Sequence, residues 1–223
     1  MTFSLVARCA STGMFGMAVA SSSPAVAARC AHARAGVGAV ASQNVTDPRL
    51  GARALDLMER GATAEEAVAI LKRGEGMDWR QVLAVDAGGG TAVHSGARAL
   101  GTWGHAEGSG AAAGGNLLSH EGVPRAMLDA FGAATGHLGE RLLLALEAGR
   151  DAGGEAGPVR SAGLLVVHEQ PWPLVDLRVD WEDGDPIAAL AGAWAVYRPQ
   201  MGTYVQRALD PEAAPSYGVP GDP

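Results

Sequence analysis

The chain opens with short apolar runs separated by turn-forming residues. Residues 2–7 (TFSLVA) and 15–21 (FGMAVAS) are mostly apolar and lie on either side of a Ser-Thr-Gly turn, a pattern typical of a β-hairpin. A third run, residues 37–43 (VGAVASQ), consists of small apolar side chains and predicts a strand that is buried on both faces. The opening of the chain is therefore predicted to be β-structure.

Two helices are predicted directly after these strands. Asp47 is placed to cap the first helix, Pro48 would be its first residue and Gly61 would end it. Thr63 starts the second helix, because Thr-Ala-Glu-Glu fits a capping box with Glu66 at the third position. The apolar face of the first helix is formed by Leu50, Ala54, Leu57 and Met58.

The rest of the chain continues with further strands and helices. Strands are predicted at 81–86, 91–95, 108–116, 162–167 and 174–179, and helices at 122–134, 138–149 and 187–197. The order β-β-β-α-α-β-β-β-α-α-β-β-α lacks the strict alternation of a parallel doubly wound sheet. It predicts an α+β fold in which two antiparallel sheets are covered by two helical layers.

The pattern shows no internal linker and no repeat, so residues 1–210 are predicted to form a single domain. Residues 211–223 are rich in Pro and Gly and are predicted to be a loosely ordered tail. The apolar runs are too short to span a membrane. The chain start has no basic segment ahead of an apolar one, so no signal peptide is expected and the predicted location is cytoplasmic.

Charge and lysine content exclude several classes of function. With 17 Lys and Arg against 24 Asp and Glu, the net charge is −7, and no basic run offers a face for nucleic acid. Lys72 is the single lysine. It lies in a predicted helix without a phosphate-binding glycine loop before it, so a Walker-type site is not expected.

Thr2 is the residue with the clearest candidate chemistry. Threonine is small enough for methionine aminopeptidase to remove Met1, which would leave Thr2 with a free α-amine. That residue would carry a hydroxyl nucleophile together with an amine base that titrates near pH ~8. Because Thr2 also begins a predicted strand, the amine would be held rigidly, as in the threonine variant of triad catalysis.

Several stretches carry a resemblance that extends from the first residues to about residue 190. TFSLVAR, GMAVASSSP and AGVGAVASQN, followed by paired helices, resemble the opening of N-terminal nucleophile (Ntn) hydrolases. More closely, the chain resembles an uncharacterised family, domain of unknown function 1028, which is placed with the Ntn-hydrolase fold. The matching stretches are Thr2–Arg8, Ala18–Ser21, Ala33–Gln43, Asp86, His94–Gly96, Gly104–His105, Gly114–Leu118, Ala162–Val167, Asp176–Asp180 and Asp185–Pro186.

The resemblance implies a four-layer αββα sandwich with Thr2 at the end of a central cleft. In the Ntn mechanism, Thr2 Oγ would attack the carbonyl of a small amide or peptide-like substrate and form an acyl-enzyme, which water then hydrolyses. The strand before the first helix would stabilise the oxyanion, which makes Ser42, Gln43 and Asn44 the candidate residues. No cofactor is expected for this chemistry.

The chain departs from proteasome-like Ntn hydrolases, which place a lysine beside the threonine. Ser21, Ser22 and Ser23 occupy the region expected to carry such charges, and they would form either a small polar pocket or a plain turn before Pro24. Arg34 is the candidate basic substitute, and an arginine acts there only through its charge because it does not lose its proton.

Alternative functions stay open at this stage. His105 and Asn116 lie in stretches that match the family, and they would either contact substrate or make structural hydrogen bonds. A second interpretation is an inactive binding or assembly module that keeps the same cleft. A third is a metal-dependent hydrolase, although the histidines lack ligand spacing and no metal site is predicted. A homo-oligomer, with a dimer as the first expectation, is also predicted.

Overall fold

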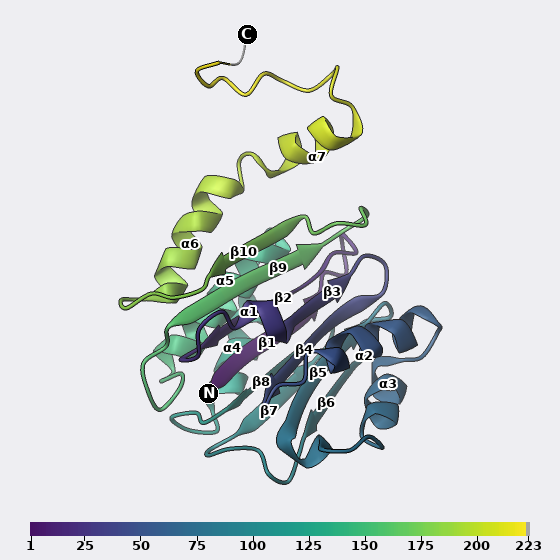
Figure 1. Cartoon of the computed structure of the whole chain (residues 1–223), viewed down its shortest axis with the longest axis vertical. Coiled ribbons are helices and arrows are strands. Elements are labelled where there is room, and N and C mark those ends of the chain that lie inside the picture. Colours follow the sequence, from purple (N-terminus) through teal and green to yellow (C-terminus); the bar gives the residue numbers. More distant parts are fainter. Residues whose placement is uncertain (222–223) are drawn as a thin grey trace.

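The computed structural model describes residues 1–221 and consists of two antiparallel sheets stacked between helices (Figure 1). One sheet has the strand order β10-β9-β2-β1-β8-β7 and the other β3-β4-β5-β6. The strands of the first sheet are β1 (Thr2–Arg8), β2 (Phe15–Ser21), β7 (Gly104–Gly108), β8 (Ala111–Asn116), β9 (Ser161–Val167) and β10 (Val175–Val179). Those of the second are β3 (Ala31–Arg34), β4 (Gly38–Asn44), β5 (Arg80–Asp86) and β6 (Thr91–Ser95).

Helices cover the outer face of each sheet. The six-stranded sheet packs against α4 (Val123–Ala133), α5 (Leu138–Asp151) and α6 (Pro186–Tyr197). The four-stranded sheet packs against α2 (Arg49–Glu59) and α3 (Ala64–Leu71). The predicted α+β fold, a four-layer αββα sandwich, is confirmed. Three shorter or more peripheral elements complete it, namely α1 (Ala27–Cys30), the 3-10 helix η1 (Met77–Trp79) and α7 (Met201–Leu209).

The alternation of side chains along the strands divides the core into three apolar layers. On β1, Phe3, Leu5 and Ala7 face α4 and α5, whereas Val6 faces the other sheet. Because successive side chains of a strand point to opposite faces, Thr2 and Ser4 share the inter-sheet face with Val6. The first strand therefore directs the candidate nucleophile between the two sheets.

Two helix starts follow the predicted capping chemistry. The Asp47 carboxylate accepts the backbone N–H of Arg49 at 3.1 Å, and Pro48 already has helical dihedral angles. At α3, Thr63 and Glu66 form both hydrogen bonds of the capping box. The Asp86 carboxylate also accepts the Ala64 N–H at 2.8 Å, which ties the start of α3 to the sheet beneath it.

Several predicted boundaries were wrong. The run predicted as one strand over 108–116 contains the end of β7, a turn at Gly110 with a φ of +70°, and β8. The helix α1 and the strand β3 were missed between β2 and β4, since they have only four residues each and show too little periodicity to detect. The helix α7 was missed as well.

The last helix, α7, extends away from the sheets (Figure 1), and none of its residues is buried. The residues after α7 fold back on it, because the Arg207 guanidinium donates to the carbonyls of Pro215 and Ser216 and lies 3.7 Å from the centre of the Tyr217 ring. Of the predicted tail, residues 222 and 223 lie outside the described part. None of the helices within residues 1–221 is both long and apolar enough for a membrane crossing.

Candidate active site

One end of the inter-sheet layer is polar, whereas its middle is apolar. The middle is filled by small and branched apolar side chains from both sheets. At the end where β1 begins, the inter-sheet positions of successive strands carry polar side chains. These are Thr2 and Ser4 on β1, Ser21 on β2, Gln43 on β4, Gln81 on β5, Ser95 on β6 and Asn116 on β8.

Thr2 lies at this end and is 5% exposed. Its Oγ1 is 3.4 Å from Ser21 Oγ on the neighbouring strand, and both hydroxyl groups donate to the carbonyl oxygen of Met1. The hydroxyl of the candidate nucleophile is thus already fixed by its neighbours, and Met1 occupies the space on its amino side.

A chain of side-chain hydrogen bonds connects the two sheets beside Thr2. Ser4 Oγ donates to Gln43 Oε1 at 2.7 Å, and Gln43 Nε2 donates to Gln81 Oε1 at 2.7 Å. Gln81 Nε2 in turn donates to Ser95 Oγ at 3.0 Å. These side chains, apart from that of Ser95, belong to fully buried residues, so the network fixes the spacing of the two sheets at the polar end of the inter-sheet layer.

Asn116 completes this network and retains an unused acceptor. It is directly opposite Thr2 in the pairing of β1 with β8, and its Nδ2 donates weakly, at 3.4 Å, to Gln81 Oε1. Its Oδ1 is buried and has no partner. A buried polar atom without a partner costs roughly 1–3 kcal/mol, so a ligand N–H at this position would be stabilised.

Glu155 is a functional candidate that sequence reasoning missed. Its carboxylate accepts the Ser22 N–H through both oxygens, at 3.0 and 3.1 Å, and the residue is 5% exposed. Burial raises the pKa of the Glu155 carboxyl to about 7, although the positive charge of the Met1 amino group and the bonds from Ser22 oppose the rise. Glu155 lies in a glycine-rich loop, where no periodic pattern marks it.

The three serines have separate roles in the structure. Ser21 Oγ contacts Thr2 and also accepts the Ser23 N–H at 3.1 Å, and Ser22 contributes its N–H to Glu155. The carbonyl of Ser23 accepts the hydroxyl of Ser161 at 2.6 Å. Hydrogen bonds to Glu155 and to Ser161 therefore hold the loop after β2 in place. The same loop contacts Thr2 through Ser21 and Glu155 through Ser22.

Of the three predicted oxyanion residues, Gln43 and Asn44 lie at the polar end of the inter-sheet layer, and Ser42 faces away from that layer. The Ser42 hydroxyl donates to the carbonyl of Asp47, on the side covered by α2. Asn44 ends β4 with a φ of +73°, and its amide binds the carbonyl of Trp79 and the N–H of Leu100. Gln81 was missed, although its alternation with Leu83 and Val85 placed it on the inter-sheet face.

Arg34 and His105 are not brought against Thr2. Arg34 is paired with Gly38, at the opposite end of β4 from Asn44, and it forms ion pairs with Asp56 and Glu59 at 2.9 and 2.7 Å. His105 lies on the edge strand β7, where it is exposed. It lines a crevice of about 580 Å³ together with Gly101, Thr102, Trp103, Gly104 and Glu121.

This crevice adjoins the site through the segment that follows Asn116. The N–H of Leu117 donates to the carbonyl of Leu100, and the N–H of Leu118 donates to that of Thr102. Within residues 1–221, no group of three His, Cys, Asp or Glu side chains is close enough to hold a metal ion. The scattered histidines are therefore not assembled into one centre in the described part of the chain.

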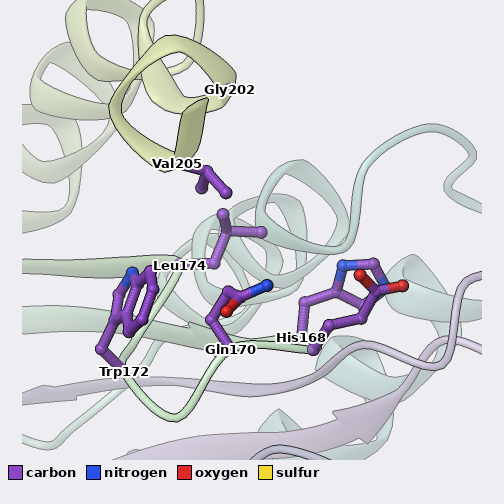
Figure 2. A pocket seen from close by; sticks show the side chains of 7 residues that line it. His168, Gln170, Trp172, Leu174, Gly202 and Val205 are labelled. Atoms are coloured by element: carbon purple, nitrogen blue, oxygen red, sulfur yellow. The ribbon is translucent and has the colours of Figure 1, made fainter. Parts of the chain in front are cut away.

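A second crevice lies far from Thr2. It has a volume of about 210 Å³ and opens between α7 and the β9–β10 connection (Figure 2). The two ends of β9 are marked by Ser161, which pairs with Ser21, and by Val167, which pairs with Phe15. At ~3.3 Å per residue, these two ends lie about 20 Å apart. The crevice lies at the Val167 end and is lined by His168, Glu169, Gln170, Trp172, Leu174, Gly202 and Val205.

The model of the family described as "Family of unknown function (DUF1028)" matches residues 2–190. A crystal structure of protein SPO2555 from Silicibacter pomeroyi, assigned to DUF1028, superposes with a TM-score of 0.82 at 31% identity and covers 88% of each chain. Anbu (ancestral beta-subunit) from Yersinia bercovieri is 12% identical, with a TM-score of 0.39 and coverage of 92% of this chain and 97% of that one. A mutant Anbu from Hyphomicrobium sp. strain MC1 is also 12% identical, with a TM-score of 0.45 and coverage of 91% and 97%. No curated protein sequence matches the chain.

Proposed function

The chain belongs to the DUF1028 family, whose function is unknown, and we propose that it is an N-terminal-threonine amidohydrolase of the Ntn type. The observation that carries this proposal is the position of Thr2. Its side chain lies at the polar end of the inter-sheet layer, beside Ser21 and opposite the unpartnered amide oxygen of Asn116.

The reaction requires that Met1 be removed, so that Thr2 carries the free α-amine. Thr2 Oγ attacks the amide carbonyl carbon while its proton passes to the α-amine. The C–N bond of the substrate then breaks, the departing amine takes that proton, and an ester of Thr2 remains. Water attacks the ester with the α-amine as base, which releases a carboxylic acid and restores the Thr2 hydroxyl.

The residues around Thr2 favour a small amide substrate. Asn116 would accept the substrate N–H through Oδ1, since that atom has no other partner. The backbone at Gln43 and Asn44 is the candidate for oxyanion stabilisation, because the left-handed turn at Asn44 ends β4 at the polar end of the inter-sheet layer. The crevice lined by His105 provides room for the rest of a polar substrate.

A panel of acyl arylamides and small peptide amides, assayed with protein that begins at Thr2, tests the proposal. We expect release of the amine product, loss of at least about 1000-fold in kcat/KM for Thr2→Ala, and retained activity for Thr2→Ser, which keeps a hydroxyl nucleophile. Thr135→Ala, at an exposed threonine outside the site, is the matched control and should leave the rate unchanged.

Hydrolysis that survives Thr2→Ala would contradict the proposal. The alternative of an inactive binding module predicts a different result. In that case amides would bind with equal affinity to the wild-type protein and to Thr2→Ala, and neither would release product.

A further inference from the structure

The loop between α5 and β9 delivers a buried carboxylate to the amino-terminal end of β1. Glu155 forms a bridge with Leu118, two residues beyond Asn116, which pairs with Thr2. On the other side it accepts the Ser22 N–H, one residue beyond Ser21, which contacts Thr2 Oγ1. Two independent links therefore place Glu155 beside the start of β1.

The amino-terminal residue itself confirms this neighbourhood. The Met1 side chain packs beside Gly157, since a Cβ added to Gly157 would lie 3.7 Å from the Met1 methyl carbon. The positive charge of the Met1 amino group acts on Glu155. A buried carboxylate is costly without a cationic partner, and the described residues place no Lys or Arg in an ion pair with this one.

We propose that Glu155 is the positioning residue of the site, which binds the Thr2 amine once Met1 has been removed. This inference rests on the proposed function, because it requires a chain that begins at Thr2. In the resting state, the ammonium would donate an N–H to the Glu155 carboxylate. To free the amine, the ammonium passes a proton to the Glu155 carboxylate. An N–H bond of Thr2 breaks, an O–H bond forms on Glu155, and no other reactant is needed.

The proton balance between the two groups suits this role. An unperturbed α-amine titrates at about 7.7–8.0, and burial brings the Glu155 carboxyl to a pKa of about 7. Two groups with similar pKa values exchange a proton at small cost, so the ammonium can pass its proton to Glu155 when the amine is needed as a base.

The other charged groups near Glu155 are already paired. Arg150 and Asp185 line the same outer crevice as Glu155, and they form an ion pair at 2.7 Å. Arg150 also binds Asp151 at 2.9 Å. His120, from the neighbouring loop, bonds to the carbonyl of Ala152 at 2.6 Å. The amino terminus is therefore the cation that Glu155 faces.

The pKa of the Thr2 amine tests this assignment directly. The full chain would be released from a ubiquitin-like fusion cleaved immediately before Thr2, so that the amine is free whether or not cells remove Met1. Trace labelling with acetic anhydride between pH 5 and pH 10, followed by peptide mass spectrometry, reports the pKa of each amine. Lys72 is the single lysine and serves as the internal reference.

We expect the amine pKa to fall by about one unit or more in Glu155→Gln, because loss of the carboxylate removes the charge that favours the ammonium. Glu155→Asp should restore part of the shift. Glu169→Gln is the matched control, since that side chain is 76% exposed and lies at the far end of β9. Lys72 should titrate alike in every variant.

An unchanged amine pKa in Glu155→Gln would overturn the role of Glu155. That outcome is distinguishable from a failure of the proposed function, because the amine titration requires no catalysis. An active enzyme with an unshifted amine would refute the positioning role alone. A shifted amine without amide hydrolysis would refute the hydrolase alone.

Discussion

Burying the Glu155 carboxyl has a consequence for stability as well as for chemistry. Its pKa is about 7 in the folded chain, against an ordinary value of 4.5, with burial as the main cause. The folded state therefore binds this proton more tightly than the unfolded state. The corresponding contribution to stability is complete below pH ~4.5 and is lost as the pH rises through about 7.

Urea denaturation of wild type and Glu155→Gln across pH 4 to pH 8 should show this linkage. We expect the free energy of unfolding of the wild type to fall relative to that of the variant as the pH rises from about 4.5 to about 7. Above pH 7 the variant should be the more stable of the two. Parallel stability curves for the two proteins would mean that Glu155 titrates as an exposed carboxylate does.

At the residue scale, the sequence singled out Thr2 because it follows Met1, and the family resemblance pointed to Gln43 and Asn116. The structure places all three at the polar end of the inter-sheet layer. Glu155 could not be found, because its contact with Ser22 spans 133 positions of the chain and its loop has no periodicity. Arg34 was named for its charge alone, and its ion pairs with Asp56 and Glu59 keep it elsewhere.

The start of α3 gives the most direct prediction at the scale of an element. Thr63→Ala removes the hydroxyl that accepts the Glu66 N–H at 3.2 Å. We expect the free energy of unfolding to fall by about 1 kcal/mol. The loss should be no larger, because the Asp86 carboxylate still accepts the Ala64 N–H. Thermal or urea denaturation would measure it.

Thr135→Ala is the matched control for this change, since it removes the same atoms from an exposed loop position between α4 and α5. An equal effect of the two substitutions would show that the capping box contributes nothing specific.

Elements were predictable where their local chemistry was strong. The alternation of apolar and polar residues predicted the hairpin of β1 and β2, and the capping residues predicted helices α2 and α3. Both signals lie within about a dozen positions of the sequence. In contrast, β3 is defined by its pairing with β4, and its four residues are all half-buried. An edge strand of this kind depends on its partner, so local sequence does not define it.

At the scale of the whole molecule, the order of strands and paired helices predicted two antiparallel sheets covered by helices, and the family resemblance predicted the four-layer αββα sandwich. The order of the strands within the sheets was not predicted, because β9 and β10 pair beside β2 from more than a hundred residues away. This pairing places Ser161 against the serine loop, and Glu155 binds the same loop through the Ser22 N–H. The predicted homo-oligomer and the cytoplasmic location stay predictions.

The central claim is that Thr2 is a nucleophile with its own amine as base. The most direct measurement is the intact mass of the protein purified from cells, before and after treatment with a β-lactone that acylates amino-terminal threonines. We expect a mass without Met1 and a single adduct that maps to Thr2 and is absent in Thr2→Ala. A protein that keeps Met1, or one that has lost Met1 and forms no adduct at Thr2, would contradict it.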